Sequence, residues 1–288
     1  MAYVMYPGGT RREFLQAFGA GVVAAGAATG SSRWALLSDT HIPTNPADEF
    51  RGFRPVDNLS KIIPDVLRFA PDGVIIDGDL AREEGLASDY RALKALLEPL
   101  AARVPVGLGL GNHDDRDNFI AAFAMEAAGE RAELNQKCVS LLSSAPLRLI
   151  LLDSLAFPHY VPGLLGKQQR EWLDGYLRRT PDAPTLLFVH HTLDDGDGSL
   201  LDFEKLLAIA QKYRWVKAVF YGHSHLYKSE TVQGLHLVNL PAVGYNFRDS
   251  APVGWVQAVF TTEGANLTLQ AIGGDTSEHG KTRSLAWR

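Results

Sequence analysis

Residues 104–115 read VPVGLGLGNHDD, and this stretch decides the fold. Its first half is an apolar, glycine-spaced run, which predicts a short buried strand. Its second half, Gly111-Asn112-His113-Asp114, places an amide, an imidazole and a carboxylate directly after that strand. Such side chains pack poorly in a core, but they bind metals and transfer protons well. The stretch therefore predicts a strand that delivers polar groups to a functional site.

Four other apolar runs end in polar clusters of the same kind. They are residues 34–38 before Asp39-Thr40-His41, residues 74–76 before Asp77-Gly78-Asp79, Thr185–Val189 before His190-His191, and Val216–Tyr221 before Gly222-His223-Ser224-His225. In open α/β sheets, sites lie outside the carboxyl ends of the strands, so five such clusters can converge on one edge. Of the nine histidines, only His159, His236 and His279 fall outside these clusters.

Each cluster alone is a weak signal. Gly78-Asp79 is also a common turn dipeptide, and an adjacent histidine pair is often a surface feature. Two histidines one residue apart at a strand end are more specific, because both rings point to the same side of the chain. Since five strand ends carry such groups, the clusters together predict one site of converging titratable residues.

The rest of the chain predicts alternating strands and helices, followed by closely spaced strands. Apolar spacing indicates helices over residues 58–69, 90–100 (ending near Pro99), 118–128, 167–177 and 202–213, the last with Asp202 near its N-cap. Strands over 137–143 and 147–152 form a predicted hairpin, and the tail offers strands over 229–233, 235–240, 255–261 and 267–271. This order is typical of an α/β protein with a mixed sheet or two sheets.

Composition excludes several classes of protein. The chain has 288 residues, 46% hydrophobic and 21% charged, which is ordinary for a soluble globular enzyme. Its formal net charge of −5 shows no basic surplus, which argues against a nucleic-acid partner or an anionic membrane surface. The single cysteine, Cys138, excludes an intrachain disulfide and a thiolate metal site, and its apolar neighbours predict that it is buried on a strand.

The first thirty residues differ in composition from the rest of the chain. Arg11-Arg12 precedes an uncharged run, FGAGVVAAGAATG, that is rich in Ala, Gly and Val. A basic pair before a mildly apolar run is typical of a twin-arginine export signal, and the run is too short for a comfortable permanent anchor. The alternative, an amphipathic first helix, is disfavoured by the glycines. We therefore expect a twin-arginine signal over residues 1–30 and one domain over residues 31–288. The precursor would bind the twin-arginine export machinery. The mature protein would have no stable membrane insertion and a periplasmic or extracytoplasmic location.

The residue types at the strand ends indicate the kind of metal. Carboxylate, imidazole and amide ligands without thiolate favour Mn, Fe, Co or Zn over a Mg or Ca cage. The number of ligands exceeds the need of one tetrahedral ion, so two ions are expected. Two cations roughly 3.5–4 Å apart clamp the attacking and leaving oxygens of a phosphoryl transfer, and they make hydroxide available near neutral pH.

The ordered series Asp-x-His, Gly-Asp, Gly-Asn-His-Asp, His and Gly-His-x-His resembles the calcineurin-like metallophosphoesterase superfamily. The stretches SDTH, GDLA, GNHDDR, LLGKQQREWLDGYL and NLPAVGY are similar to its class III cyclic-nucleotide and glycerophosphodiester phosphodiesterases. The resemblance runs from about Trp34 to Leu269. It implies a four-layer αββα sandwich of two mixed β-sheets flanked by helices.

The resemblance also implies roles for individual residues. Asp39, His41 and His225 would hold one metal; Asn112, His190 and His223 would hold the other; Asp79 would bridge them; and His113 would protonate the leaving oxygen or stabilise the transition state. His191 would support the ligand shell or the substrate. Guanidinium groups pair with phosphate, so Arg51, Arg54, Arg116 and Arg248 are substrate-side candidates. Arg116 is the strongest of them, whereas Arg51 and Arg54 are better interpreted as solvated loop residues.

The implied function is dinuclear, metal-dependent hydrolysis of a small phosphodiester by hydroxide attack, with His113 assisting the leaving group. The alternatives are a phosphomonoesterase or nucleotide pyrophosphatase on the same scaffold, or a metal-binding protein without catalysis. A nuclease is disfavoured by the acidic balance and the lack of Lys/Arg clusters.

Two positions depart from the family pattern. Thr192 replaces the usual proline after the histidine pair, and Arg82 stands where an acid often orients the catalytic histidine. Arg82 would disfavour the protonated imidazole of His113 if it lay beside that ring. Alternatively, Arg82 points to solvent, and Glu83 or Asp114 orients His113.

Overall fold

Two mixed β-sheets form the centre of the molecule. The computed structural model describes residues 4–5, 30–123, 134, 137–144, 147–180 and 183–288. The first sheet has the order β1 (Val4–Met5), β4 (Val106–Leu108), β3 (Gly73–Ile76), β2 (Ser31–Leu37), β11 (Pro252–Thr261), β12 (Gly264–Gly274) and β13 (Thr282–Ala286). The second has the order β5 (Ser140–Ser144), β6 (Leu147–Leu152), β7 (Thr185–Val189), β8 (Val216–Tyr221), β10 (Leu235–Asn239) and β9 (Lys228–Val232).

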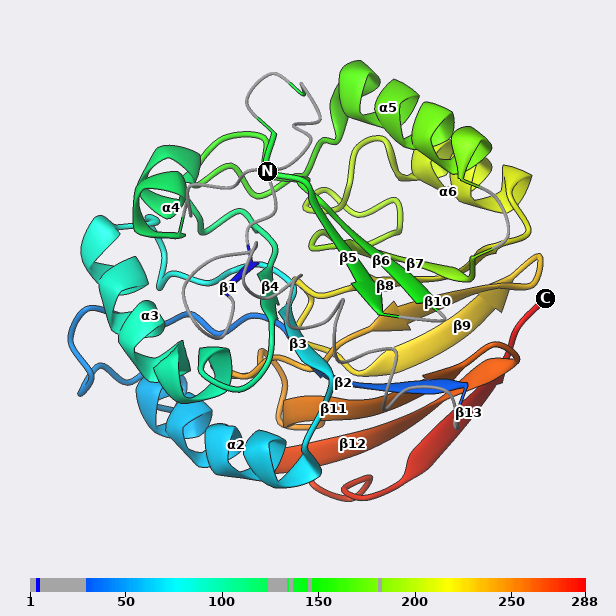
Figure 1. Cartoon of the computed structure of the whole chain (residues 1–288). Helices are drawn as coiled ribbons and strands as arrows, with labels where there is room; N and C mark the ends of the chain where they lie inside the picture. Colours follow the sequence, from blue (N-terminus) through cyan, green and yellow to red (C-terminus); the bar gives the residue numbers. More distant parts are fainter. Residues whose placement is uncertain (1–3, 6–29, 124–133, 135–136, 145–146, 181–182) are drawn as a thin grey trace.

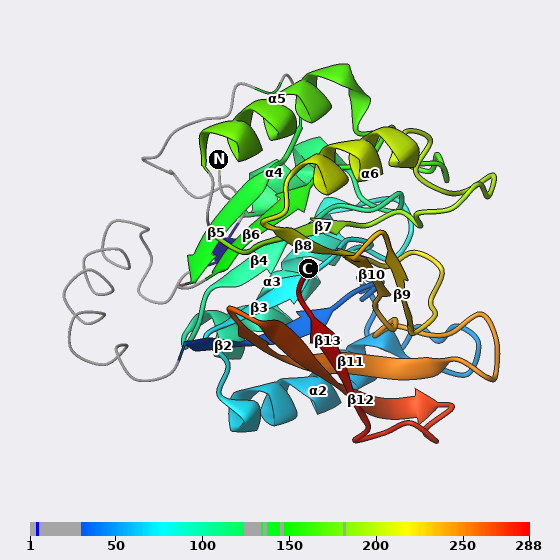
Figure 2. The ribbon, with the colours of Figure 1, turned by 90° about the vertical axis from the view of Figure 1, so that its right-hand side faces the viewer.

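Helices cover the outer faces of both sheets (Figures 1 and 2). They are α2 (Pro55–Phe69), α3 (Ala87–Ala101) and α4 (Arg116–Phe123) on the first sheet, and α5 (Gly166–Arg179) and α6 (Phe203–Lys212) on the second. In the first sheet β2, β3 and β4 run parallel, and in the second β6, β7, β8 and β10 run parallel. The expected four-layer αββα sandwich is confirmed.

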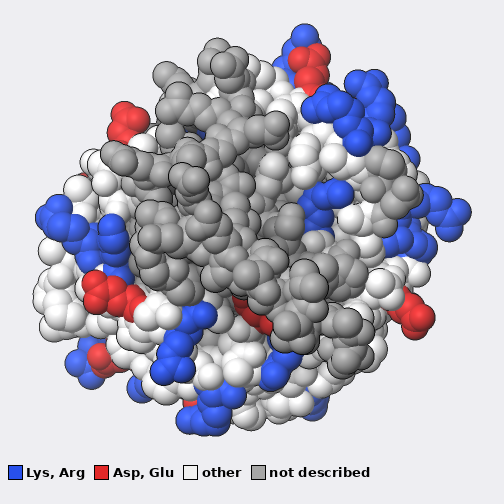
Figure 3. All heavy atoms as spheres, viewed as in Figure 1, with Lys and Arg blue, Asp and Glu red and all other residues white. Residues whose placement is uncertain are grey.

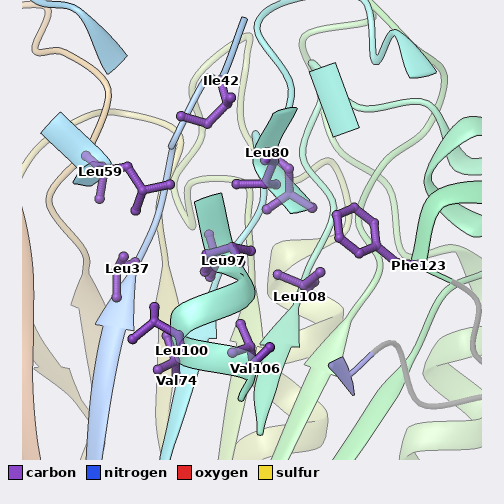
Figure 4. Close-up of a cluster of buried hydrophobic side chains, with 14 of the residues drawn as sticks. Leu37, Ile42, Leu59, Val74, Leu80, Leu97, Leu100, Val106, Leu108 and Phe123 are labelled. Atoms are coloured by element: carbon purple, nitrogen blue, oxygen red, sulfur yellow. The ribbon is translucent and has the colours of Figure 1, made fainter. Parts of the chain in front are cut away.

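Three apolar cores separate the four layers. Because side chains alternate along a strand, Trp34 and Leu36 of β2 pack between the sheets, whereas Ala35 and Leu37 pack against the helices. The helix-side core of the first sheet is drawn in Figure 4, where residues of α3 meet those of β3 and β4. Every strand that leads into the predicted site is thus buried on both faces, which fixes where its end lies.

Packing rather than capping holds α2 in place. Arg54 at its N-cap makes no side-chain capping bond within the described chain. A missing cap costs about 1 kcal/mol. The helix buries Leu59, Ile62 and Val66 completely, and each such side chain contributes about 1.5–3 kcal/mol. Burial therefore outweighs the missing cap.

Most predicted elements are present. Helix α3 ends at Ala101, one residue beyond its predicted end and two beyond Pro99. Asp202 is the N-cap residue of α6, as expected, and its backbone carbonyl accepts from Lys205 and Leu206. Its carboxylate makes no capping bond within the described chain; it accepts hydrogen bonds from the backbone N–H groups of Leu165 and Gly166. The edge strand β13 was not predicted, because its residues carry no apolar alternation.

Some predictions fall partly outside the described residues. Helix α4 ends at Phe123, and the remainder of the predicted helix lies in the undescribed 124–133. The hairpin of β5 and β6 is confirmed, although its turn at 145–146 is undescribed. Cys138 is buried as expected, but it precedes β5.

The export signal is likewise almost wholly undescribed. Residues 6–29 lie outside the described range, while Val4–Met5 pair with β4. Among the residues that the structure describes, no helix combines the length and the apolar character needed to cross a membrane.

Gly73 permits the fit between the two sheets, which gives a testable prediction. A Cβ added there would lie 2.5 Å from the buried indole ring of Trp34. We expect Gly73→Ala to lower the free energy of unfolding by about 1–3 kcal/mol, because overpacking forces the ring or the strand to move. Urea denaturation measures this loss. Gly175→Ala in α5 is the control, since a Cβ there meets only the flexible end of the Arg179 side chain, and an equal loss of stability in the two variants would contradict the prediction.

Candidate metal centre

The polar clusters converge where the carboxyl ends of the two sheets meet. Backbone bonds tie neighbouring clusters together: the N–H of Asp39 donates to Gly78 O at 3.1 Å, and the N–H of Gly222 donates to His190 O at 2.9 Å. Since β2 and β3 belong to one sheet and β7 and β8 to the other, the site spans the sandwich. All seven predicted metal ligands lie in this region, and only His223 among them is more than marginally exposed.

One group of ligand atoms comprises Asp39, His41 and His225. Their ligand atoms all lie within 4.8 Å of one another. His225 Nε2 is 3.2 Å from Asp39 Oδ1 and also 3.2 Å from His41 Nε2. Two imidazole nitrogens facing each other at this distance beside a carboxylate are well suited to hold a cation between them.

A second group comprises Asp79, His190 and His223, again within 4.8 Å. His190 Nε2 lies 3.3 Å from Asp79 Oδ2, and the same oxygen lies 3.7 Å from His41 Nε2 of the first group. Asp79 therefore stands between the two groups.

Asn112 is the predicted amide ligand of the second group, and the backbone N–H of its neighbour His113 donates to Asp79 Oδ1. The Asn112 side chain is buried, and within the described part of the chain nothing donates to its Oδ1. A buried amide oxygen without a hydrogen bond is costly unless another electrophile, such as a cation, meets it. The donors at this centre are nitrogen and oxygen atoms throughout. They fit a pair of transition-metal ions.

Backbone carbonyls set the tautomers of three of these histidines. His41 Nδ1 contacts Arg82 O at 3.2 Å, His190 Nδ1 contacts Asp77 O at 2.7 Å, and His225 Nδ1 contacts Tyr245 O at 2.6 Å. A carbonyl only accepts, so each Nδ1 must donate its N–H. In the neutral ring the lone pair is then on Nε2, which faces the cluster and is ready to bind a metal.

The backbone at the centre is strained. A left-handed φ of 46–67° is found at Asp39, His41, Asp79, His223 and His225. Each such residue costs of order 1–3 kcal/mol, and such strain concentrates at functional sites. Here it occurs directly after three strands, β2, β3 and β8, at the residues that carry ligand side chains.

Two glycines allow the clusters to approach closely. A Cβ at Gly111 would lie 2.2 Å from Asp79 Oδ1, and a Cβ at Gly222 would lie 2.0 Å from Ser38 Oγ and 2.5 Å from Asp39 Oδ2. The glycines that precede the ligands in GNHD and GHSH are therefore required because any side chain there would clash with Asp79 or with Ser38 and Asp39, and not because a turn needs their backbone freedom.

The carboxylates hold one extra proton on the metal-free cluster. Burial lowers the pKa of His190, but the nearby Asp79 and Asp39 carboxylates outweigh burial and raise it to about 10. Burial lowers the pKa of His41 to about 3 and that of His223 to about 4, so both are neutral at pH 7. Two of these three rings are thus already in the metal-binding form, and His190 must lose its proton to join them.

His113 stands at the edge of the centre, half-buried. Its backbone N–H donates to Asp79 Oδ1 at 2.9 Å, and its Nδ1 donates to Glu83 O at 3.1 Å. The ring centroid is 5.2 Å from that of His41. The carbonyl of Glu83 therefore orients His113, which the sequence left open between three residues.

Neither of the other two residues has that role. The Arg82 guanidinium lies 4.5 Å from the centre of the Phe50 ring. Asp114 accepts hydrogen bonds from the backbone of Gly111 and Leu80 and from the Tyr90 hydroxyl, so it holds the loop that carries His113.

His159 is a neighbour of the site that the sequence patterns did not indicate. Its backbone N–H donates to Asn112 O at 3.0 Å, and its ring centroid lies 6.5 Å from that of His113. Glu84 Oε1 lies 3.7 Å from its Nε2. His159 has a left-handed φ of 61°, but a backbone angle cannot be read from a sequence, so no sequence pattern marked this residue.

Arg116, the strongest of the substrate-side candidates, and His191 both contact other groups. Arg116 forms a two-point ion pair with the buried Asp153, at 2.7 and 3.0 Å, and also donates to Leu155 O. The interpretation of Arg116 as a phosphate ligand is therefore corrected to a structural one. His191 is buried, and its Nδ1 is 2.7 Å from Ser154 Oγ. Its ring centroid lies 5.0 Å from that of His223, so it packs beside this predicted ligand.

A second correction concerns basic clusters. The sequence shows no run of Lys and Arg, yet folding gathers several of them over α5 and α6 (Figure 3, upper right). They line a groove of about 760 Å³ between the two helices. The basic residues that line it are Lys167, Arg170, Arg178, Lys205 and Lys212. Three of them pair with Glu171, Asp202 and Asp174. None of the metal-ligand candidates lines this groove.

Comparison with known proteins identifies the family. The profile described as calcineurin-like phosphoesterase matches residues 32–227. The chain belongs to this family. It is accordingly placed among the metal-dependent phosphoric ester hydrolases, as the strand-end motifs predicted.

Its relatives include phosphodiesterases. A cAMP/cGMP dual specificity phosphodiesterase from Mycobacterium tuberculosis is 27% identical over 80% of this chain and 73% of that protein. A glycerophosphodiester phosphodiesterase from Enterobacter lignolyticus is 27% identical over 76% of this chain and 81% of that protein. Among solved structures, a dimetal phosphatase from Danio rerio shares the fold with a TM-score of 0.73, at 17% identity over 89% of this chain and 99% of that one.

The raised pKa of His190 predicts that metal loading releases protons. At pH 7 the metal-free protein holds a proton on His190 that a cation must displace, so apparent affinity rises with pH toward that pKa of about 10. Isothermal titration with Mn²⁺ or Zn²⁺ in buffers of different ionisation enthalpy should give about one proton released from this residue. His190→Ala should lower the number released, and a binding heat that does not depend on the buffer would contradict the prediction.

Proposed function

We propose that this chain is a dinuclear metal-dependent phosphodiesterase that hydrolyses a small phosphodiester. One observation carries the proposal: two groups of buried nitrogen and oxygen ligands share the carboxylate of Asp79. A shared carboxylate between two cations reduces their mutual repulsion. A two-cation site is suited to in-line phosphoryl transfer.

The residues would divide between two ions. Asp39, His41 and His225 would hold one, and His190, His223 and Asn112 would hold the other. Asp79 would serve both, because it belongs to the second group and lies 3.7 Å from His41 of the first. The donor set suits Mn, Fe, Zn or Co. When bound, such ions polarise a phosphoryl oxygen and make hydroxide available near neutral pH.

His113 acts on the leaving group. Its ring projects from the same loop as Asn112, and the Glu83 carbonyl accepts from its Nδ1, which leaves Nε2 to face a substrate. A protonated Nε2 donates to the leaving oxygen as the ester bond breaks. The backbone N–H of His113 binds Asp79, so the ring stays at a fixed distance from the ligands. The presence of both His113 and every ligand position speaks against a purely metal-binding protein.

Metal analysis tests the bridging role. Protein purified without chelator should contain close to two transition-metal ions per chain. Asp79→Asn should lose metal from both positions, together with its activity, because the carboxylate charge is shared by both groups. Inductively coupled plasma spectrometry measures the content, and Asp65→Asn, at an exposed position, is the control. Full metal content and full turnover in Asp79→Asn would exclude the assignment.

The preference for diesters separates the proposal from its alternative, a phosphomonoesterase or nucleotide pyrophosphatase on the same scaffold. The names of both sequence relatives support diesters. We expect kcat/KM for an aryl phosphodiester to exceed that for the matched monoester at equal metal content. The comparison uses one leaving group, so that its acidity does not contribute. A monoester preference would favour the alternative.

We propose in addition that residues 1–30 are a twin-arginine signal and that the mature domain acts in the periplasm or another extracytoplasmic space. The Arg11-Arg12 pair carries this proposal, since the pathway reads the pair rather than its charge. Replacing both arginines by lysine should leave the precursor in the cytoplasm, as measured by fractionation. Unchanged export would indicate another route or none.

A further inference from the structure

Three aromatic rings stand beside the Asp39, His41 and His225 group. We call them the aromatic wall: Phe50, Tyr245 and Phe247. The Phe247 ring stacks on the His225 ring with centroids 4.1 Å apart and planes 21° apart. Tyr245 lies 4.7 Å from His41 and 4.8 Å from His225, and Phe50 lies 4.6 Å from Tyr245. The wall is therefore in direct contact with two of the proposed metal ligands.

Two arginines flank the wall. The Arg51 guanidinium carbon is 5.3 Å from the centre of the Phe247 ring and 5.6 Å from that of Phe50. The Arg82 guanidinium lies over Phe50 and at 5.8 Å from Tyr245. Guanidinium groups stack on aromatic faces and still present N–H donors at their edges.

A tight turn fixes the position of Arg51. The backbone groups of Phe50 and Phe53 exchange two hydrogen bonds, at 2.8 and 3.0 Å. Between them Arg51 has a φ of 52° and Gly52 a φ of 81°, both left-handed. A left-handed arginine is uncommon, and such strain gathers at ligand-binding positions. The turn thus fixes the backbone of Arg51 beside the wall, and its exposed guanidinium lies near Phe50 and Phe247.

The members of the wall differ in exposure. Tyr245 is 3% exposed and serves the core of the site, whereas Phe247 is 46% exposed. Phe247 contacts a metal ligand while nearly half of its surface faces solvent, with an exposed arginine beside it. An exposed apolar surface continuous with a reactive centre is typical of a ligand-binding surface.

We propose that Phe247 and Arg51 bind a planar aromatic group of the substrate, a nucleobase or an aryl ring. This inference rests on the proposed phosphodiesterase function and names the class of ester that the site prefers. A phosphoester held at the metal ligands places its alcohol group next to His225, within reach of the exposed Phe247 surface. The ring stacks on Phe247, and Arg51 donates hydrogen bonds to acceptors on its edge. A polyol such as glycerol has no π-face and gains little there.

Paired substrates and variants test the wall. The measured quantity is kcat/KM for a 3′,5′-cyclic nucleotide and for a glycerophosphodiester, at equal and measured metal content. Phe247→Leu should raise KM for the cyclic nucleotide by roughly tenfold, because one base-stacking contact is lost. The value for the glycerophosphodiester should fall much less, since it makes no such contact, so the ratio of the two kcat/KM values is the readout and cancels any general effect on His225. Arg51→Gln should change the ratio in the same direction, and it touches no metal ligand.

Phe157→Leu is the matched control. Phe157 is an exposed aromatic residue, 69% accessible, that is not part of the wall. It should leave both substrates unaffected. Equal effects of Phe247→Leu on both substrates, no effect on either, or the same selective loss in Phe157→Leu would overturn the proposal.

Failure of the proposed function gives a different result. Wild-type protein that hydrolyses neither diester but cleaves monoesters refutes the phosphodiesterase, and the wall is then tested with monoesters. The two monoesters adenosine 5′-monophosphate and glycerol 3-phosphate are then the paired substrates, and kcat/KM for each is compared in the wild type and in Phe247→Leu at equal metal content. A selective loss for the nucleotide supports the wall. Equal losses, or none, overturn it.

Discussion

The contact of His190 with the end of β3 is the interaction on which the rest of the site depends. His190 follows β7 in the second sheet, yet its Nδ1 donates to Asp77 O and its Nε2 lies 3.3 Å from Asp79 Oδ2, both beyond β3 in the first sheet. This contact joins the two sheets at the edge where the ligands gather. It requires Gly111, because a Cβ there would lie 2.6 Å from the His190 ring. The apolar core between the sheets sets their separation, and the imidazole spans it at the carboxyl end.

The backbone conformation and the buried carboxylates of the centre lower the free energy of unfolding of the protein when no cation is bound. Five of its residues have left-handed backbone at of order 1–3 kcal/mol each. Asp77 is buried, no described residue donates to its carboxylate, and burial raises its pKa to about 8. A domain is stabilised by only about 5–15 kcal/mol in total, so these costs are tolerable only on a well-packed scaffold. Strands buried on both faces supply that scaffold, and ions bound to the native state would add stability by mass action.

Local patterns predicted most strands and the convergence of the polar groups that follow them, for a physical reason, whereas the four-layer arrangement came from the family resemblance. A strand that is buried on both faces is a continuous apolar run, and a ligand that follows it directly is fixed by that strand alone. β7 and β8 were predicted with their observed bounds. Arg116 was misread because its partner, Asp153, is distant in sequence, and the two meet only after β6 and α4 pack. The orientation of His113 by a backbone carbonyl, and the stacking of Arg82 on Phe50, leave no trace in residue types.

Two unlike surfaces adjoin the centre, and their placement bears on how a substrate would lie. His113 and His159 face each other, with Glu84 beside His159. The aromatic wall packs on His41 and His225, and His41 also lies 5.2 Å from His113, so the two surfaces meet at one predicted ligand. Under the proposed function, the leaving oxygen would point toward His113 and an aromatic group of the same ester would lie on the wall. A polyol ester would contact the polar surface and gain little from the wall.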